Sequence, residues 1–136
     1  MNGKYKNTLS ELPPLIFTGI TLLAILWLTL SPRPFGSMET PFFPGADKIV
    51  HGLMFGFFTA MMAFDKRRKN HFRPLPFYTL IIFALLSSLL GVAIEYLQEA
   101  LHTGRAFEYA DMAADTIGAF AFAIGLYIFQ SKHQEK

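Results

Sequence analysis

Four long apolar stretches account for most of this 136-residue chain. They run from Leu12 to Pro32, from Ile49 to Phe64, from Leu75 to Ile94 and from Met112 to Gln130. About 20 apolar residues in a helix cross the roughly 30 Å hydrocarbon core of a bilayer. Helices are the expected form, because a backbone in lipid must satisfy its own hydrogen bonds. We therefore predict an all-α integral membrane bundle of four transmembrane helices, spanning about residues 12–32, 48–65, 75–98 and 110–130.

Length and composition limit the remaining choices. Four spans with short connections use nearly the whole chain, so we predict a single domain over residues 1–136. The chain has no cysteine, which excludes disulfides, zinc–thiolate sites and iron–sulfur clusters. Its net charge is +2, but the positive residues flank the apolar stretches and form no basic face. We therefore expect no nucleic-acid partner, and we expect the lipid bilayer to surround the protein.

Basic residues divide unevenly between the connections, and this bias predicts the topology. Most belong to the N-terminal tail, the second connection and the C-terminal tail: Lys4, Lys6, Lys66, Arg67, Arg68, Lys69, Arg73, Lys132 and Lys136. The first and third connections hold only Arg33, Lys48 and Arg105. Lys and Arg in short loops favour the cytoplasmic side, so both termini are predicted to be cytoplasmic. The second connection could also attract anionic lipid headgroups, at about 1 kcal/mol per basic residue.

With that topology, polar side chains gather at the outer ends of the predicted helices. The group comprises Asp47, Lys48, His51, Glu95, Gln98, Glu99, Arg105, Glu108, Asp111 and Asp115. Asp47 and His51 are four residues apart and therefore share one helix face. Ionisable groups within membrane spans are candidates for function. A buried salt-bridge network that fixes helix register is the structural alternative.

Small residues form stripes along the same helices. Gly52 and Gly56 are four apart in the second span, and Gly91 lies four residues before Glu95 in the third. In membranes such stripes mark close helix packing, so the acids on them should point inward. Gly52 and Gly56 suit packing within the chain or between chains. The sequence leaves the oligomeric state open.

Several of these residues form motifs that resemble the VanZ-like family of membrane proteins. The first is Asp47-Lys48-x-x-His51-x-x-x-Phe55; the second is Glu95-x-x-Gln98, then Arg105, then Asp111-x-x-x-Asp115-x-x-Gly118. The motifs occur in the family's order and in a chain with four apolar stretches. In one departure, Asp115 stands where the family often has asparagine. That departure adds a negative charge to the cluster.

The resemblance carries expectations about location and role. It implies a multi-pass protein of the bacterial cytoplasmic (inner) membrane, belonging to the cell envelope, with the motif residues near the outer face. The family takes its name from a glycopeptide-resistance cluster, whose member is associated with reduced susceptibility to teicoplanin. A link to teicoplanin-type antibiotic resistance is therefore one expectation. The resemblance implies no particular reaction.

Our first functional hypothesis is a pocket for an anionic or polar envelope component, such as a lipid headgroup or a lipid-linked cell-wall precursor. The candidate binding residues are Lys48, His51, Glu95, Gln98, Arg105, Asp111 and Asp115. Arg105 and Lys48 would attract the ligand, because an arginine fork binds phosphate in bidentate fashion. Glu95 and Asp111 would position Arg105 and His51.

Two further hypotheses come from other classes of protein. An intramembrane hydrolase or transferase could use His51 as a general acid or base beside Glu95 or Asp111. Against it, the chain has no nucleophile elbow and no His-Glu-x-x-His motif. One histidine with scattered acids is a weak ligand set, so we expect no metal and no cofactor. A structural or accessory envelope protein is the other alternative. Transport is disfavoured, because the acids gather at one end of the spans.

Overall fold

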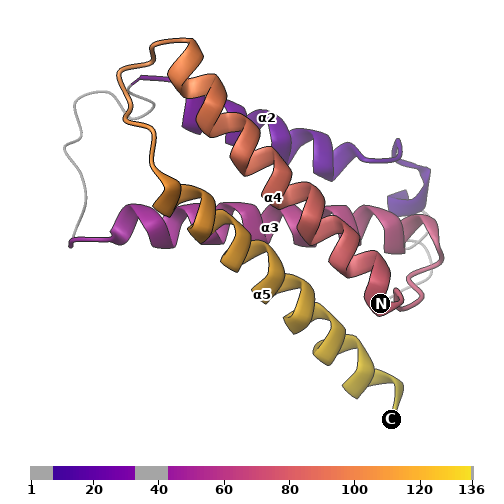
Figure 1. Ribbon diagram of the computed structural model, residues 1–136. Helices are drawn as coiled ribbons and strands as arrows, with labels where there is room; N and C mark the ends of the chain where they lie inside the picture. Colours follow the sequence, from indigo (N-terminus) through magenta and orange to yellow (C-terminus); the bar gives the residue numbers. More distant parts are fainter. Residues whose placement is uncertain (1–7, 33–42, 136) are drawn as a thin grey trace.

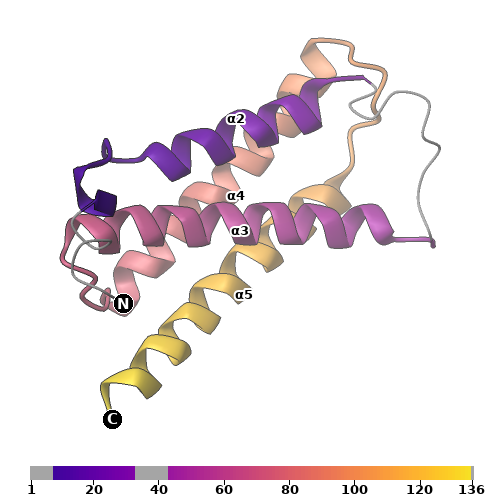
Figure 2. The ribbon, with the colours of Figure 1, turned by 180° about the vertical axis from the view of Figure 1, so that it is seen from behind.

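The computed structural model describes residues 8–32 and 43–135 (Figure 1). Residues 8–11 are helical, and four long helices follow. These are α2 (Ile16–Leu30), α3 (Ala46–Lys69), α4 (Phe77–Ala100) and α5 (Tyr109–Gln134). Successive helices run in alternating directions, so the C-terminal ends of α2 and α4 lie near the N-terminal ends of α3 and α5 (Figures 1 and 2). The described residues are all-α, as the sequence predicts, with no strand among them.

Proline explains why α2 is shorter than the predicted span of residues 12–32. Pro13 and Pro14 precede it, and Leu15 adopts a left-handed conformation with φ 61° just before the helix begins. At the other end Ser31 is extended, as the residue before Pro32 must usually be. The 15 residues of α2 rise only about 22 Å. The predicted second, third and fourth spans fall almost entirely inside the longer helices α3, α4 and α5.

Helix α3 is the centre of the fold, because it contacts each of the other three helices, whereas α2 and α5 do not touch. Its closest neighbour is α5. A Cβ atom on Gly118 would lie 1.9 Å from the carbonyl oxygen of Gly52, and a Cβ on Gly56 would lie 2.3 Å from the Phe122 ring. The small-residue stripe of α3 therefore packs within the chain, at the crossing of α3 and α5.

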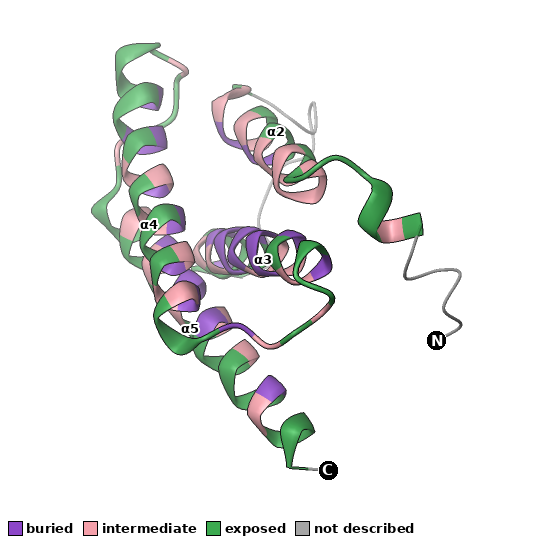
Figure 3. Ribbon diagram, turned by 90° about the vertical axis from the view of Figure 1, so that its right-hand side faces the viewer, coloured by how far each residue is buried: buried purple, intermediate pink, exposed green. Residues whose placement is uncertain are grey.

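Polar groups lie inside this bundle, while large apolar side chains are exposed on its outer faces. Figure 3 shows the buried positions of the helices on the sides that face one another and the exposed positions on the outside. Thr59 of α3 and Ser87 of α4 are fully buried, and their hydroxyl oxygens are 2.8 Å apart. Conversely, Ile20, Leu53 and Leu89 are more than half exposed. In water such apolar faces would be unusual, but lipid tolerates them. The distribution therefore fits helices whose outer surfaces contact lipid.

Two helices meet the length and composition needed to cross a membrane: α4, with a mean hydropathy of 2.3, and α5, with 1.7. Helix α2 is apolar but short. Helix α3 is long, but Asp47 and Lys48 begin it, and Lys66, Arg67, Arg68 and Lys69 form its last turn. Those basic residues stabilise the helix end, because the last carbonyl groups carry partial negative charge.

Candidate functional site

The two ends of the bundle differ in charge. The acidic end joins the C-terminal ends of α2 and α4 to the N-terminal ends of α3 and α5. Among the residues that the structure describes there, six carboxylates stand against two cations: Asp47, Glu95, Glu99, Glu108, Asp111 and Asp115 against Lys48 and Arg105. We call the opposite end the basic end, because its described residues include Lys66, Arg67, Arg68, Lys69, Arg73 and Lys132. All seven candidate binding residues from the sequence lie at the acidic end. They form two adjoining groups, with Glu95 between them. The first group holds Lys48, His51, Asp111 and Asp115, and the second holds Gln98 and Arg105.

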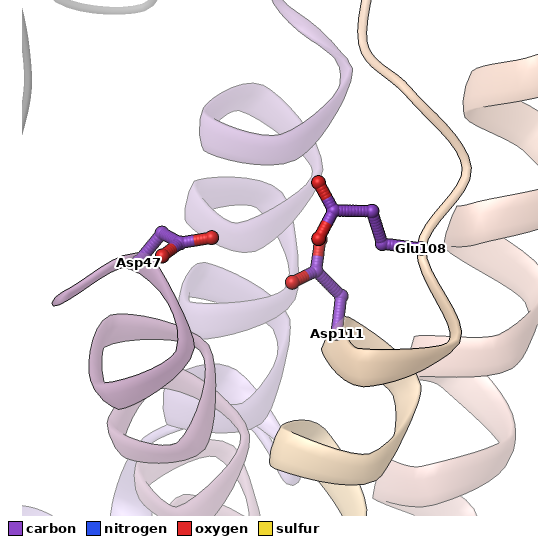
Figure 4. Close-up of side chains that lie close together, drawn as sticks. All are labelled: Asp47, Glu108 and Asp111. Atoms are coloured by element: carbon purple, nitrogen blue, oxygen red, sulfur yellow. The ribbon is translucent and has the colours of Figure 1, made fainter. Parts of the chain in front are cut away.

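Lys48 is the centre of the first group. Its Nζ atom lies 2.8 Å from Asp47 Oδ2 and 2.5 Å from Asp111 Oδ1, and it also hydrogen-bonds Glu108 Oε2. Figure 4 shows these three side chains close together: Asp47 from the start of α3, Asp111 from the start of α5, and Glu108 from the connection that precedes α5. The hydrogen bond from Lys48 lowers the pKa of the Asp47 carboxyl, which lies just before the predicted second span.

The same three carboxylates are the described residues best arranged to hold a metal ion. One oxygen from each of Asp47, Glu108 and Asp111 lies within 4.8 Å of the others. However, the ammonium group of Lys48 contacts all three and takes the place that a cation would need. A metal ion could bind there only if Lys48 moved away. We therefore assign Lys48 as the counter-ion of this cluster.

His51 and Asp115 form a buried pair deeper in the bundle. His51 Nδ1 lies 2.9 Å from Asp115 Oδ1, and the two residues are 6% and 1% exposed. An ionised carboxylate only accepts, so Nδ1 donates and Nε2 is left for another partner. Nε2 faces Asp111 Oδ2 at 3.8 Å, which is too far for a hydrogen bond. The arrangement orients an imidazole whose second nitrogen can exchange a proton.

Glu95 sits between the two groups and is only 1% exposed. Its Oε2 accepts a hydrogen bond of 3.1 Å from the backbone N–H of Glu108, and its Oε1 is buried without a partner among the described residues. The sequence hypothesis pairs Glu95 with Arg105. In the structure Glu95 instead holds the connection that leads into α5. An unpartnered buried carboxylate oxygen is costly, so it needs an explanation.

Arg105 and Gln98 belong to the second group and bind the end of α2. Arg105 Nη1 donates to the carbonyl oxygens of Leu28 at 2.9 Å and Thr29 at 3.3 Å, and Gln98 Nε2 donates to Thr29 at 2.6 Å. The last carbonyl groups of a helix lack partners within the helix. Arg105 and Gln98 supply those partners from another part of the chain, so they fix α2 against the end of α4.

A pocket of about 350 Å³ opens beside Arg105, between the end of α4 and the connection that follows it. It is lined by Gln98, Glu99, His102, Gly104, Arg105 and Phe107. Sequence reasoning missed His102, Gly104 and Phe107 as site residues. Gly104 has φ 80°, a conformation that favours glycine, so a turn here was the available signal. The Phe107 ring contacts two tyrosines: it is tilted against Tyr96 at a centroid distance of 5.3 Å and lies edge-to-face with Tyr109 at 5.0 Å.

The basic end also contains a buried polar group, which the sequence analysis did not anticipate. Asp65 and Arg68 are each 1% exposed, and Asp65 Oδ1 accepts from Arg68 Nε at 3.0 Å and from Nη2 at 2.9 Å. Asp65 Oδ2 also accepts from the backbone N–H and hydroxyl of Thr18, both at 2.8 Å. Asp65 thereby caps the N-terminal end of α2 from α3. The sequence signal for this pair is that Asp65 lies three residues before Arg68, which places both on one face of a helix.

Comparison with known proteins identifies a family. The family model described as VanZ/LLP1 matches residues 6–130. No curated protein matches significantly. No solved structure matches significantly either. The matched range covers both motif blocks and all the helices down to Gln130 of α5.

Proposed function

This chain belongs to the VanZ/LLP1 family, and we propose that it is a multi-pass protein of the bacterial cytoplasmic membrane, with its acidic end facing outward. On this proposal residues 1–136 form one domain of four spans, with both termini in the cytoplasm. The apolar outer faces of the helices support the membrane setting. The excess of Lys and Arg at the basic end supports the orientation.

Helices α2 and α3 do not meet both the length and the composition requirement for a membrane span, so their assignment as spans needs separate support. The charges of α3 lie in its first and last turns, except Asp65, which is buried against Arg68 and Thr18. The apolar residues between those turns can therefore face lipid. Helix α2 is shorter than a bilayer core, but local thinning of the bilayer accommodates a short span at modest cost.

The proposed function is binding of an anionic or polar envelope component at the pocket beside Arg105. The observation that carries it is the position of Arg105. Only Nη1 of its guanidinium is hydrogen-bonded to other described residues, and the side chain is exposed in the wall of the pocket. The remaining N–H groups can donate to a phosphate or carboxylate, and the hydrogen bonds to α2 hold the fork in place. His102 and Gln98 supply further polar groups.

The surrounding acids narrow the class of ligand. Glu99 lines the same pocket, and the other described acids of this end of the bundle outnumber its cations. This excess of negative charge disfavours a simple multivalent anion. It favours a headgroup that combines one anionic group with amine or hydroxyl donors. Zwitterionic lipid headgroups and lipid-linked cell-wall precursors have that composition. Binding of such a precursor would also connect the protein to teicoplanin susceptibility.

The buried pair of His51 and Asp115 favours one alternative, an intramembrane hydrolase or transferase. The carboxylate orients the ring through Nδ1, which leaves Nε2 to take a proton from water or a substrate hydroxyl. Loss of turnover in His51→Gln, with ligand binding retained, would favour this alternative over binding alone.

Binding is tested by native mass spectrometry of the purified protein with phosphatidylethanolamine, phosphatidylglycerol and undecaprenyl phosphate. We expect Arg105→Gln to lose at least one of these ligands, and Lys132→Gln, which removes the same charge at the other end of the bundle, to keep it. Because Arg105 also fixes α2, His102→Ala is the second variant, since no hydrogen bond from the His102 side chain holds the described fold together. Unchanged binding in both Arg105→Gln and His102→Ala would refute the proposal.

A further inference from the structure

A second pocket, of about 270 Å³, lies at the basic end and is separate from the proposed headgroup site. It opens between the end of α3, the connection into α4 and the last turns of α5. Its walls include Arg67, Phe72, Pro74, Phe129, Gln130 and His133. Nothing in the acidic-end site depends on these residues.

Arg67 lines this pocket with a guanidinium group that has unused donors. Its Nη2 donates to the carbonyl oxygen of Phe72 at 3.1 Å, but its Nε is buried and has no partner among the described residues. A guanidinium group is permanently charged, and a buried donor without an acceptor costs free energy. The structure therefore contains a cationic group with N–H donors that lack acceptors among the described residues. A bound anion would supply one.

His133 lines the same pocket and has one free ring nitrogen. Its Nδ1 lies 2.9 Å from the carbonyl oxygen of Phe129, one turn earlier in α5. A carbonyl oxygen only accepts, so Nδ1 carries the proton in this contact. The Nε2 atom remains for a ligand and can accept a hydrogen bond from a hydroxyl group of it. Packing of the ring on Phe129, at a centroid distance of 4.2 Å, fixes its orientation.

The other walls are rigid or apolar. The Gln130 amide is buried and occupied, because its Oε1 accepts from the Leu75 N–H at 3.1 Å and its Nε2 donates to the Leu75 carbonyl. This double contact ties the connection before α4 to α5 and forms a firm base for the pocket. Phe72, Pro74 and Phe129 provide apolar surface, which suits the glycerol or acyl portion of a lipid.

The charges around the pocket favour an anion. Arg68 and Lys69 are occupied by Asp65 and by carbonyl groups of the segment before α2. Lys66, Arg73 and Lys132 add positive charge at the same end and are exposed, whereas Arg67 is half-buried. The C-terminal ends of α3 and α5 and the side chain of Glu135 oppose this attraction. Among the described residues, six basic side chains against Asp65, Glu11 and Glu135 leave this end positive.

We propose that this pocket binds a phosphate group, held by Arg67 and His133. Two sources can present that chemistry: the headgroup of an anionic phospholipid in the inner leaflet, and free inorganic phosphate. Arginine forms bidentate hydrogen bonds with phosphate, and its charged hydrogen bonds are the strong ones. The site goes beyond the proposed function, because it lies at the opposite end of the bundle.

The experiment measures binding to the full-length protein in detergent. Native mass spectrometry counts bound phosphatidylglycerol against phosphatidylcholine, and melting temperatures are recorded with inorganic phosphate in the absence of lipid. The test variants are Arg67→Gln and Arg67→Lys. The control is Lys66→Gln, which removes the same charge from the neighbouring exposed position on α3. Arg67→Lys keeps the charge but removes the Nε donor.

We expect both Arg67 variants to weaken binding of the phosphate group, with roughly a tenfold loss for Arg67→Gln, and Lys66→Gln to stay close to the parent. Stabilisation by inorganic phosphate alone would identify a free anion as the source. Preference for phosphatidylglycerol without an effect of phosphate would identify a lipid headgroup. Equal losses in Arg67→Gln and Lys66→Gln would overturn the site in favour of diffuse charge. Absence of both bindings in the parent would also overturn it, even if the Arg67 variants failed to fold.

Discussion

Asp115 reaches His51 across the bundle because Gly91 has no side chain. The Nδ1 and Oδ1 atoms of the pair are 2.9 Å apart, and a Cβ atom at position 91 would lie only 2.5 Å from Asp115 Oδ2. Three helices thus meet at this point: His51 comes from α3, Gly91 from α4 and Asp115 from α5. The glycine of one helix makes room for the acid of another, which in turn orients the histidine of a third.

Gly91→Ala should therefore lower stability. The added methyl group would force Asp115 to move, and overpacking of this kind costs about 1 to 3 kcal/mol. Thermal unfolding in detergent measures the effect. Gly125→Ala is the matched control, because no heavy atom lies within 4 Å of its Cβ position and alanine favours a helix by roughly 0.5 to 1 kcal/mol. A Gly91→Ala protein as stable as the parent would contradict the close packing.

Glu95→Gln and Asp111→Asn should have different effects on stability, although each neutralises one acid. Glu95 has a buried oxygen without a partner, so its neutralisation should leave the melting temperature unchanged or raise it. Asp111 contacts Lys48, and Asp111→Asn should cost about 1 to 3 kcal/mol. Melting temperatures of the two variants provide the test. Equal falls in both would mean that Glu95 has a stabilising partner.

The buried pair at the basic end should be a strong determinant of folding. Asp65→Asn leaves the Arg68 guanidinium buried without its counter-ion and weakens the cap of α2, which predicts a loss of about 3 to 5 kcal/mol. Lys66→Gln, one residue away but exposed, should change stability by less than about 0.5 kcal/mol. Urea unfolding monitored by circular dichroism compares them. Similar losses for the two variants would argue against a role specific to the pair.

Lys48→Gln should turn the acidic cluster into a cation site. Without the ammonium group, the oxygens of Asp47, Glu108 and Asp111 repel one another, and carboxylate oxygens are preferred ligands of Ca²⁺. We expect a lower melting temperature in chelator, with a rise on addition of millimolar Ca²⁺ that is larger than in the parent. If Ca²⁺ stabilised the parent as strongly, Lys48 would not be the resident counter-ion.

The positions of the helices follow from the sequence with little help. Apolar stretches of sufficient length predict α4 and α5 closely, and the prolines at positions 13, 14 and 32 explain why α2 ends within its predicted range. The gathering of acids at one end is likewise predictable, because alternating helices bring every second connection to the same side. Sequence spacing does not predict which of these side chains form hydrogen bonds or ion pairs with one another.

Arg105 illustrates that limit. The sequence offers it as a counter-ion for acids at the same end, but the structure uses it to bind carbonyl groups at the end of α2. The partner of a long, flexible side chain depends on which unsatisfied groups lie within reach, and these carbonyls are 76 and 77 residues earlier in the chain. The basic-end pocket was equally hidden, because its walls come from three separate segments.

The sequence by itself determined the helical class, the approximate ranges of α3, α4 and α5, the asymmetry of charge and the family of this protein. These features depend on local composition and on spacing along the chain, which are fully present in one dimension. Only the tertiary structure decided that Lys48 joins three carboxylates, that Asp115 holds His51, and that Arg67 keeps an unpartnered donor. Those outcomes depend on distances of a few ångströms between helices, and such distances are set by how the glycine faces of α3, α4 and α5 pack together.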